Sequence, residues 1–173
     1  KIISITGSCG KTSLKELLGN SLNKISKASI SPKSFNNKYG VPLSLFNLNH
    51  NDNYGVLEVG MDKKGEIDAL TKMIRPDLGL ITNISYAHIE NFKNLDQIAK
   101  AKGEIINNIV PGGTMVINMD DKYYNFFLKK AKKRNLNIIS FSKKNKKANV
   151  VFLNQKKNIK NYKIKIKINN NIK

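Results

Sequence analysis

Several features of exported and membrane proteins are missing from this sequence of 173 residues. Its single cysteine excludes an intrachain disulfide framework and is typical of a reducing compartment. No apolar run approaches the length of a membrane span, and no signal peptide is visible. We therefore expect a cytoplasmic protein with no membrane partner. The chain is long enough for one domain with its own core, and we expect it to be a piece of a longer protein.

Acidic residues are scarce, with 12 Asp and Glu against 31 Lys and Arg, and the net charge is +19. A charge of this size can indicate a nucleic-acid or membrane-binding surface. However, Lys, Asn and Ile are abundant together, and Asn has no electrostatic reason to increase with Lys. The basic residues are also spread along the chain and do not gather with aromatic residues. A compositional bias explains this pattern better, so we predict no nucleic-acid partner; a non-catalytic basic binding module is the alternative.

The first residues form the pattern of a phosphate-binding loop. A short apolar run at residues 2–5 leads into a glycine-bracketed loop that ends in Gly-Lys-Thr and opens a helix. Glycines allow close approach of a ligand, and the first amides of the helix favour an anion. Lys11 is expected to reach the outer phosphates and Thr12 to hold a magnesium ion. The predicted nucleotide-binding residues are Thr6, Gly7, Ser8, Cys9, Gly10, Lys11, Thr12 and Ser13.

This loop is shorter than the common form, because Ile5 stands where G-x-x-x-x-G-K-[ST] has a glycine. A phosphate-loop kinase or GTPase switch predicts glycine there, and a tight strand-to-helix turn with a chance Gly-Lys-Thr is a further alternative. Helical spacing supports a helix after the loop. The residues at that spacing are Leu14, Leu17, Leu18, Leu22 and Ile25.

Strands and helices alternate along the rest of the chain. Short apolar strands are expected near residues 26–30, 54–60, 78–82, 114–118 and 137–141, and helices over 41–46, 65–74, 95–109 and around 123–128. This order predicts an α/β fold of the phosphate-loop type, with a mostly parallel sheet flanked by helices. Residues 162–168 alternate Ile with Lys, which predicts an antiparallel strand near the C-terminus with one buried face.

Polar residues follow several of the predicted strands. In an open parallel sheet, ligands bind beyond the carboxyl ends of the strands, where Glu58 and the loop with His88 are expected. Glu58 ends an apolar strand, where a carboxylate is unfavourable unless it is paired or bound to metal. Beside a bound triphosphate, Glu58 and His88 predict a magnesium site; a surface ion pair and a structural histidine are the alternatives. Asp120 and Asp121 are expected to cap the next helix.

Lys102 falls inside the apolar stripe of the helix predicted over residues 95–109. It lies four residues after Ile98 and three before Ile105, so it faces the same way, whereas Lys100 faces solvent. Its side chain either extends to solvent or has a buried role. A buried lysine with a lowered pKa is neutral and nucleophilic. It would then react with carbon dioxide to form a carbamate, an anionic oxygen ligand for magnesium.

Five stretches in order resemble the Mur ligases of peptidoglycan synthesis, namely residues 6–16, 34–43, 58–67, 81–90 and 99–105. The resemblance is greatest to members that add D-alanyl-D-alanine to UDP-N-acetylmuramoyl-tripeptide. It implies that residues 1–173 are the central ATP-binding domain, incomplete at its C-terminal end. It also implies a domain for the UDP-linked substrate before this chain, a closing domain after it, and a bacterial cytoplasmic enzyme, with a monomer favoured.

The resemblance also implies a mechanism. ATP phosphorylates the terminal carboxylate of the tripeptide, and the amine of D-alanyl-D-alanine then attacks the acyl phosphate. Lys11 would bind the phosphates, Glu58 and His88 would hold a second magnesium ion, and Lys102 would be carbamylated. Asn37 would lie near the transferred phosphate. The sequence departs from the family at Cys9, where Asn is frequent, and at Ser85, where Gly is usual.

Other ligases of the superfamily share the phosphate loop, including the diaminopimelate- or lysine-adding enzymes and folylpolyglutamate synthases. The stretches around Asn36-Asn37 and residues 87–90 favour the D-alanyl-D-alanine-adding members over them.

Overall fold

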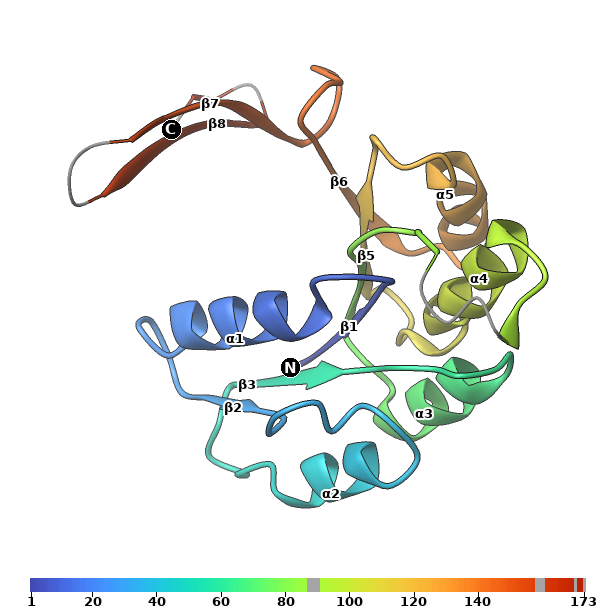
Figure 1. The fold of residues 1–173 in the computed structure, drawn as a ribbon. Helices are drawn as coiled ribbons and strands as arrows, with labels where there is room; N and C mark the ends of the chain where they lie inside the picture. The colour runs from blue at the N-terminus through green and yellow to red at the C-terminus, as the bar shows by residue number, and fades with distance from the viewer. Residues whose placement is uncertain (87–90, 158–160, 170, 173) are drawn as a thin grey trace.

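The computed structural model describes residues 1–86, 91–157, 161–169 and 171–172. Within these ranges the strands form one nine-stranded sheet in the order β2-β3-β1-β4-β5-β6-β7-β8-β9 (Figure 1). The strands are β1 (Ile2–Thr6), β2 (Ala28–Ile30), β3 (Tyr54–Glu58), β4 (Leu78–Ile81), β5 (Thr114–Asn118), β6 (Asn137–Ser142), β7 (Val150–Lys157), β8 (Tyr162–Ile168) and β9 (Asn171–Ile172). The helices are α1 (Lys11–Leu22), α2 (Gly40–Phe46), α3 (Glu66–Ile74), α4 (Leu95–Lys102), the 3₁₀ helix η2 (Gly103–Asn108) and α5 (Tyr124–Lys133).

The neighbouring strands from β2 to β7 pair in parallel, whereas β7–β8 and β8–β9 are antiparallel. The predicted mostly parallel α/β sheet with an antiparallel strand near the C-terminus is therefore confirmed. β1 lies between β3 and β4, with Ile3 opposite both Val56 and Leu78. The chain leaves β1 for β2 on one side and later crosses to β4 on the other. The carboxyl end of β1 is thus a topological switch point, where such sheets bind ligands.

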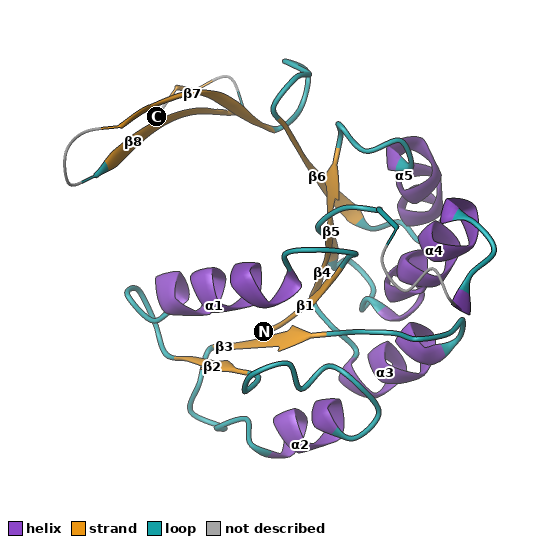
Figure 2. Ribbon diagram, in the orientation of Figure 1, coloured by secondary structure: helices purple, strands orange, loops and turns teal. Residues whose placement is uncertain are grey.

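Helices cover both faces of the parallel part of the sheet (Figure 2). On one face, Leu14, Leu18 and Leu22 of α1 pack against Ile3, Ile5 and Val56. The larger core lies on the other face and includes side chains of α3, α4, η2 and α5. Within the described ranges no helix is both long and apolar enough to cross a bilayer.

The helix predicted after the phosphate loop is present as α1, but two of the residues at helical spacing, Leu17 and Ile25, do not pack on the sheet. Leu17 is 70% exposed and Ile25 is 77% exposed. The stripe of Leu14, Leu18 and Leu22 already covers the strands below α1, and Leu17 lies beside that stripe. Ile25 comes after the end of the helix at Leu22.

The helix predicted over residues 95–109 is two elements, because α4 ends at Lys102 and the chain tightens into η2. Two long-range contacts begin at this point. The carbonyl of Gly103 accepts a hydrogen bond from the Lys130 ammonium at 2.8 Å, and the Glu104 carboxylate accepts from the amide of Gly65 at 2.9 Å, just before α3. Neither contact is visible in the helical periodicity, which continues through η2.

The predicted buried face of β8 is only partly present, because Ile166 and Ile168 are half-buried whereas the first half of the strand is exposed. Tyr162 is 60% exposed and Ile164 is 55% exposed. β8 pairs with β7, which the sequence analysis did not predict, and Figure 1 shows this hairpin extending away from α3, α4 and α5. The alternation of Ile and Lys correctly indicates a strand, but the described part of the chain places no helix against it.

Candidate nucleotide-binding site

The phosphate loop, residues 6–13, joins the carboxyl end of β1 to the start of α1. Its two glycines have backbone conformations that other residues rarely adopt, with φ of 144° at Gly7 and 79° at Gly10. A Cβ atom at Gly7 would lie 1.8 Å from Oγ1 of Thr82, so no side chain fits there. Gly10 is the N-cap of α1. These features are those expected of a cradle that lets phosphates approach the backbone.

The phosphate loop is hydrogen-bonded along its length to the segment after β4. The amide of Ser8 donates to the carbonyl of Asn83 at 2.9 Å, and the amide of Cys9 donates to the Asn83 side-chain oxygen at 3.2 Å. In return, the Thr82 hydroxyl donates to the carbonyl of Cys9 at 2.7 Å, and the amide of Ser85 donates to Oγ of Ser8 at 2.9 Å. The two segments therefore form one rigid surface at the switch point.

The predicted nucleotide-binding side chains lie at different depths. The Lys11 ammonium donates to the loop's own carbonyls of Gly7 and Ser8, at 3.0 Å and 3.4 Å. Ser13 is exposed, whereas Thr6 is fully buried and its hydroxyl has no hydrogen-bond partner among the described residues. The contacts of Lys11 place its charge within the cradle, where it can meet phosphate oxygens.

Glu58, at the carboxyl end of β3, is buried beside the phosphate loop with an exposed fraction of 1%. One carboxylate oxygen accepts from the hydroxyl of Thr12 at 2.7 Å, and the other accepts from the side-chain amide of Asn36 at 2.7 Å. Among the described residues, no Lys or Arg forms an ion pair with this carboxylate. A buried anion held by neutral donors is favourable to cation binding.

The donor set around Glu58 fits magnesium. A carboxylate and a hydroxyl are hard oxygen ligands, and Mg²⁺ in nucleotide sites is usually bound by one or two carboxylates plus phosphates. The described part of the chain contains no cluster of three His, Cys, Asp or Glu that would hold a metal alone. Thr12 and Glu58 are therefore the residues that would bind the ion together with a nucleotide. His88, the other predicted ligand, lies outside the described residues.

The two asparagines of the Asn-Asn pair point in different directions. Asn36 reaches Glu58, whereas the side-chain oxygen of Asn37 accepts from the amide of Gly40 at 2.9 Å and so caps the start of α2. Asn37 also lines a cavity of about 560 Å³ between Gly60 and α3. The residues predicted from sequence include Asn37 but not Asn36. The pair of asparagines was the only signal for Asn36, and its role at Glu58 depends on the fold.

Lys102 is buried as predicted, with 1% of its surface exposed. Burial, and to a lesser extent the positive charge of Lys11, lower the pKa of its ammonium from 10.5 to about 8, while Cys9 acts in the opposite direction. This electrostatic coupling puts Lys102 close to the phosphate loop. About a tenth of the amine is therefore neutral at pH 7, far more than for a lysine with the ordinary pKa.

Asp120 and Asp121 are structural, but the predicted cap is wrong for both, because the N-cap of α5 is Tyr123 and no side chain caps this helix. Asp121 accepts from the amide of Tyr123, the residue before α5, at 2.8 Å. Asp120 does not cap α5; it accepts from the hydroxyl of Ser142 at 2.5 Å and the amide of Lys143 at 2.6 Å. Asp120 therefore stabilises the loop after β6, which is close to it because β5 and β6 are neighbours.

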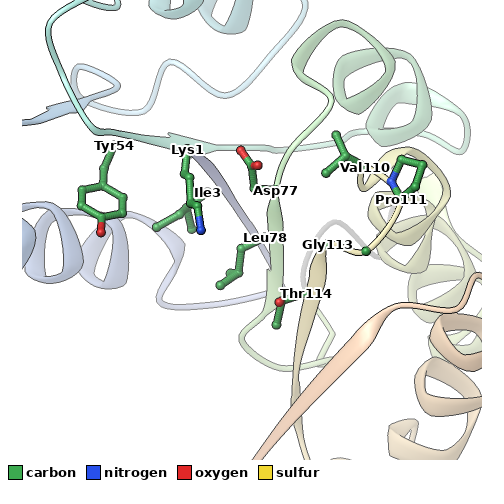
Figure 3. Close-up of a pocket in the computed structure, with 10 residues that line it drawn as sticks. Lys1, Ile3, Tyr54, Asp77, Leu78, Val110, Pro111, Gly113 and Thr114 are labelled. Atoms are coloured by element: carbon green, nitrogen blue, oxygen red, sulfur yellow. The ribbon is translucent and has the colours of Figure 1, made fainter.

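A smaller cavity of about 260 Å³ lies at the amino ends of the parallel strands, opposite the end that carries the phosphate loop (Figure 3). It is lined by residues near the amino ends of four strands, including Ile3, Tyr54, Leu78 and Thr114. Because the phosphate loop follows the carboxyl end of β1, this cavity is separate from the nucleotide site.

The known proteins that this chain is similar to include ligases whose names match the family that its sequence resembles. The UDP-N-acetylmuramoyl-tripeptide–D-alanyl-D-alanine ligase of Buchnera aphidicola subsp. Acyrthosiphon pisum is 42% identical over 147 residues, which is 85% of this chain and 32% of that protein. MurF from Acinetobacter baumannii superposes with a TM-score of 0.91 at 31% identity, covering 100% of this chain and 37% of the other.

MurF from Thermotoga maritima in complex with ADP has a TM-score of 0.84 at 27% identity, with 99% of this chain and 39% of the other covered. The chain thus spans about a third of the length of these relatives. The family model of the Mur ligase middle domain matches residues 5–172. The chain belongs to the Mur ligase middle-domain family.

Proposed function

We propose that this chain is the central ATP-binding domain of a ligase that adds D-alanyl-D-alanine to UDP-N-acetylmuramoyl-tripeptide in peptidoglycan precursor synthesis. The observation that carries the proposal is the convergence at Glu58, where Thr12 of the phosphate loop and Asn36 meet one buried carboxylate. The relatives that bear the name of this activity support the choice of substrates.

The proposed reaction has two steps. The γ-phosphoryl group of ATP is transferred to the terminal carboxylate of the tripeptide, which forms an acyl phosphate and releases ADP. The amine of D-alanyl-D-alanine then attacks the acyl carbon, forms the amide bond and expels inorganic phosphate. Both steps develop charge on phosphoryl oxygens, so positioning and cations supply most of the catalysis. Lys11 would bind the phosphates, and Thr12 and Glu58 would hold magnesium.

Lys102 is proposed to act as a carbamate. Carbamate formation requires a neutral amine, and burial favours the neutral form of this lysine. The product would carry a negative charge near Lys11, and its oxygens would be magnesium ligands. His88 is proposed as a further ligand and Asn37 as a contact of the transferred phosphate.

The domain organisation and location are part of the same proposal. The UDP-linked substrate would be held by a domain before this one, and a further domain would close over the nucleotide. We propose a bacterial cytoplasmic monomer whose partners are its small substrates, with neither nucleic acid nor membrane among them. The excess of Lys over acidic residues then reflects composition and not a binding surface.

The test uses the full-length parent protein. Phosphate release from ATP is measured with UDP-N-acetylmuramoyl-tripeptide and, in turn, D-alanyl-D-alanine or single amino acids. We expect release that requires the dipeptide and is lost in Lys11→Ala. Lys24→Ala is the matched control, because Lys24 is an exposed lysine just after the same helix.

Each outcome decides between specific alternatives. Release driven by a single amino acid would move the protein to another ligase of the superfamily. No release with any acceptor would contradict the ligase function, leave only nucleotide binding at the phosphate loop, and favour a kinase or switch.

A further inference from the structure

Lys15 is a fully buried lysine, with 0% of its surface exposed. It lies on α1, one turn after the phosphate loop. Its ammonium donates to the carbonyl of Ser31 at 2.6 Å and to the carbonyl of Lys33, and it forms an ion pair with Glu16 at 3.1 Å. An ammonium group removed from water is stable only with such acceptors. The reaction proposed above assigns it no role.

Both backbone acceptors belong to the asparagine loop, which we define as residues 31–39 between β2 and α2. Lys33 adopts a left-handed conformation with φ of 45°, which is unfavourable for a residue with a side chain. Lys15 binds the carbonyl of this same residue. The buried ammonium therefore holds the loop in a conformation that the loop alone would not favour.

The asparagine loop forms one wall of the Glu58 site. The hydroxyl of Ser31 accepts from the amide of Glu58 at 3.2 Å. Asn36 donates its side-chain amide to the Glu58 carboxylate, and its carbonyl accepts from the amide of Gly60 at 2.7 Å. Displacement of the loop would therefore withdraw one of the two donors that orient this carboxylate.

Helix α1 thus reaches Glu58 by two routes. Thr12 contacts one carboxylate oxygen directly at 2.7 Å, and Lys15 fixes the loop whose Asn36 contacts the other. Gly19, one turn further along α1, allows close packing on β2, since a Cβ atom there would lie 2.3 Å from Cδ1 of Ile30. The contacts of Lys15 therefore hold α1 and the asparagine loop in a fixed position relative to each other.

We propose that Lys15 is a positioning residue that locks the asparagine loop to the phosphate-loop helix, so that Asn36 orients Glu58 for the metal and the transferred phosphate. This inference rests on the proposed ligase function for its kinetic consequence, but its structural part does not. The polar contacts of Lys15 are with Ser31, Lys33 and Glu16, and the proposal gives it no direct contact with nucleotide or substrate. It acts through Asn36, and its loss should mimic loss of Asn36.

The kinetic test is a double-mutant cycle in the full-length parent protein with Lys15→Met and Asn36→Ala. We expect each single variant to lower kcat about 30-fold, with KM for ATP changed less than about 3-fold, and the double variant to be no worse than the poorer single variant, because residues acting as a unit are not additive. Losses that multiply in the double variant would show that Lys15 does not act through Asn36 and would overturn the proposal.

A rescue variant separates positioning from general stability. Lys33→Gly removes the unfavourable left-handed conformation and should be close to neutral alone. Combined with Lys15→Met, it should restore about a third or more of the lost kcat, because glycine adopts the left-handed conformation at position 33 without the strain that Lys15 otherwise offsets. No restoration would contradict the proposal. If Lys15→Met does not fold, Lys15→Gln keeps two N–H donors and is used in the same cycle with a smaller expected loss.

Amide hydrogen exchange tests the structural part without any substrate. In Lys15→Met, the amides of Asn36 and Gly60 should exchange about ten times faster, because local opening controls their exchange, while those of β1 are unchanged. Unchanged exchange at Asn36 and Gly60 would overturn the proposal. If the wild-type parent releases no phosphate with any acceptor, the ligase function fails, and this measurement still decides the role of Lys15.

Discussion

Lys15 of α1 and Lys102 of α4 have the opposite environment to the lysines of the β7–β8 hairpin. Lys15 and Lys102 are 0% and 1% exposed, and both lie beside the phosphate loop or the loops around it. Lys163 and Lys165 of β8 are exposed to water. A buried ammonium must find acceptors or lose its proton, whereas an exposed one needs neither. A net charge of +19 therefore says little about binding partners, whereas the two buried lysines indicate where polar groups have a specific role in the fold or the site.

The largest expected effect comes from removing a buried lysine at the site. In the full-length parent, Lys102→Ala should lower ligase activity by at least about 100-fold, as expected for loss of a group that organises a metal. Added short carboxylic acids should restore part of it if the carbamate is correct. Lys100→Ala, an exposed lysine on the same helix, should stay near wild type. Equal losses of activity in Lys102→Ala and Lys100→Ala would contradict the claim that the buried lysine, and not the exposed one, has a role in the site.

The pH dependence of stability should also distinguish Lys102. Its pKa is about 8 in the folded chain against an ordinary 10.5. Between these values the unfolded chain binds a proton that the folded chain has released, so stability rises with pH through this window. Below pH 8 the full cost of the buried ammonium is present. The total rise is roughly 3 kcal/mol, at about 1.4 kcal/mol per pKa unit.

The measurement is denaturant unfolding of the nucleotide-free, metal-free protein at pH 7 and pH 10. Wild type and Lys100→Ala should both show the rise, and Lys102→Met should show a flatter profile because it has no titrating group. Lys102→Met should also be at least as stable as wild type at pH 7, since an apolar side chain removes the cost of the buried charge. Parallel pH profiles for wild type and Lys102→Met would refute this prediction.

A smaller effect is expected at Cys9, which is exposed at the start of α1. Bound nucleotide should cover it, and with ATP at ten times its Kd, alkylation should slow roughly tenfold, as mass action requires. Labelling is unambiguous because the chain has one cysteine. Mass spectrometry of iodoacetamide-treated protein with and without Mg-ATP gives the rate. Equal rates would place the nucleotide away from this loop.

The smallest effect is expected in the hairpin. Ile164 is 55% exposed, so Ile164→Thr should change the free energy of unfolding by less than about 0.5 kcal/mol. Ile105 in the core is fully buried, and Ile105→Ala should cost about 2–5 kcal/mol. Chemical denaturation of both variants checks the contrast. A large loss for Ile164→Thr would mean that the outer face of the hairpin is covered in the protein.

Local patterns were enough to predict the parallel sheet, the phosphate loop and the burial of Lys102. Each depends on residues close together in sequence, such as the Gly-Lys-Thr after an apolar run or the spacing of Ile98, Lys102 and Ile105. The exposure of Ile164 could not be predicted in this way, because alternation specifies a strand and not what packs against it. The change from α4 to η2 depends on Lys130 and Gly65, which are distant in sequence.

The same reasoning explains why Asn36 and Lys15 are not among the site residues predicted from sequence. The Asn36-Asn37 pair has two equivalent side chains in sequence, and only the fold of the asparagine loop turns Asn36 to Glu58. Lys15 lies three residues before Leu18 and seven before Leu22, so its phase is that of the buried stripe of α1, but the carbonyls that accept its hydrogen bonds are 16 and 18 residues away. Predictions from sequence therefore fail where a polar group is satisfied by a partner far along the chain.

The hydrogen bonds between the phosphate loop and residues 82–85 have a consequence for the thermodynamics of nucleotide capture. Because Ser8 and Cys9 are already fixed by Asn83 and Thr82, little backbone freedom is left for a ligand to remove. Binding should therefore carry a small conformational entropy loss, and calorimetry should report it as mainly enthalpic. Loosening these bonds, for example by Asn83→Ala, should make the entropy of binding less favourable while leaving the phosphate contacts themselves intact.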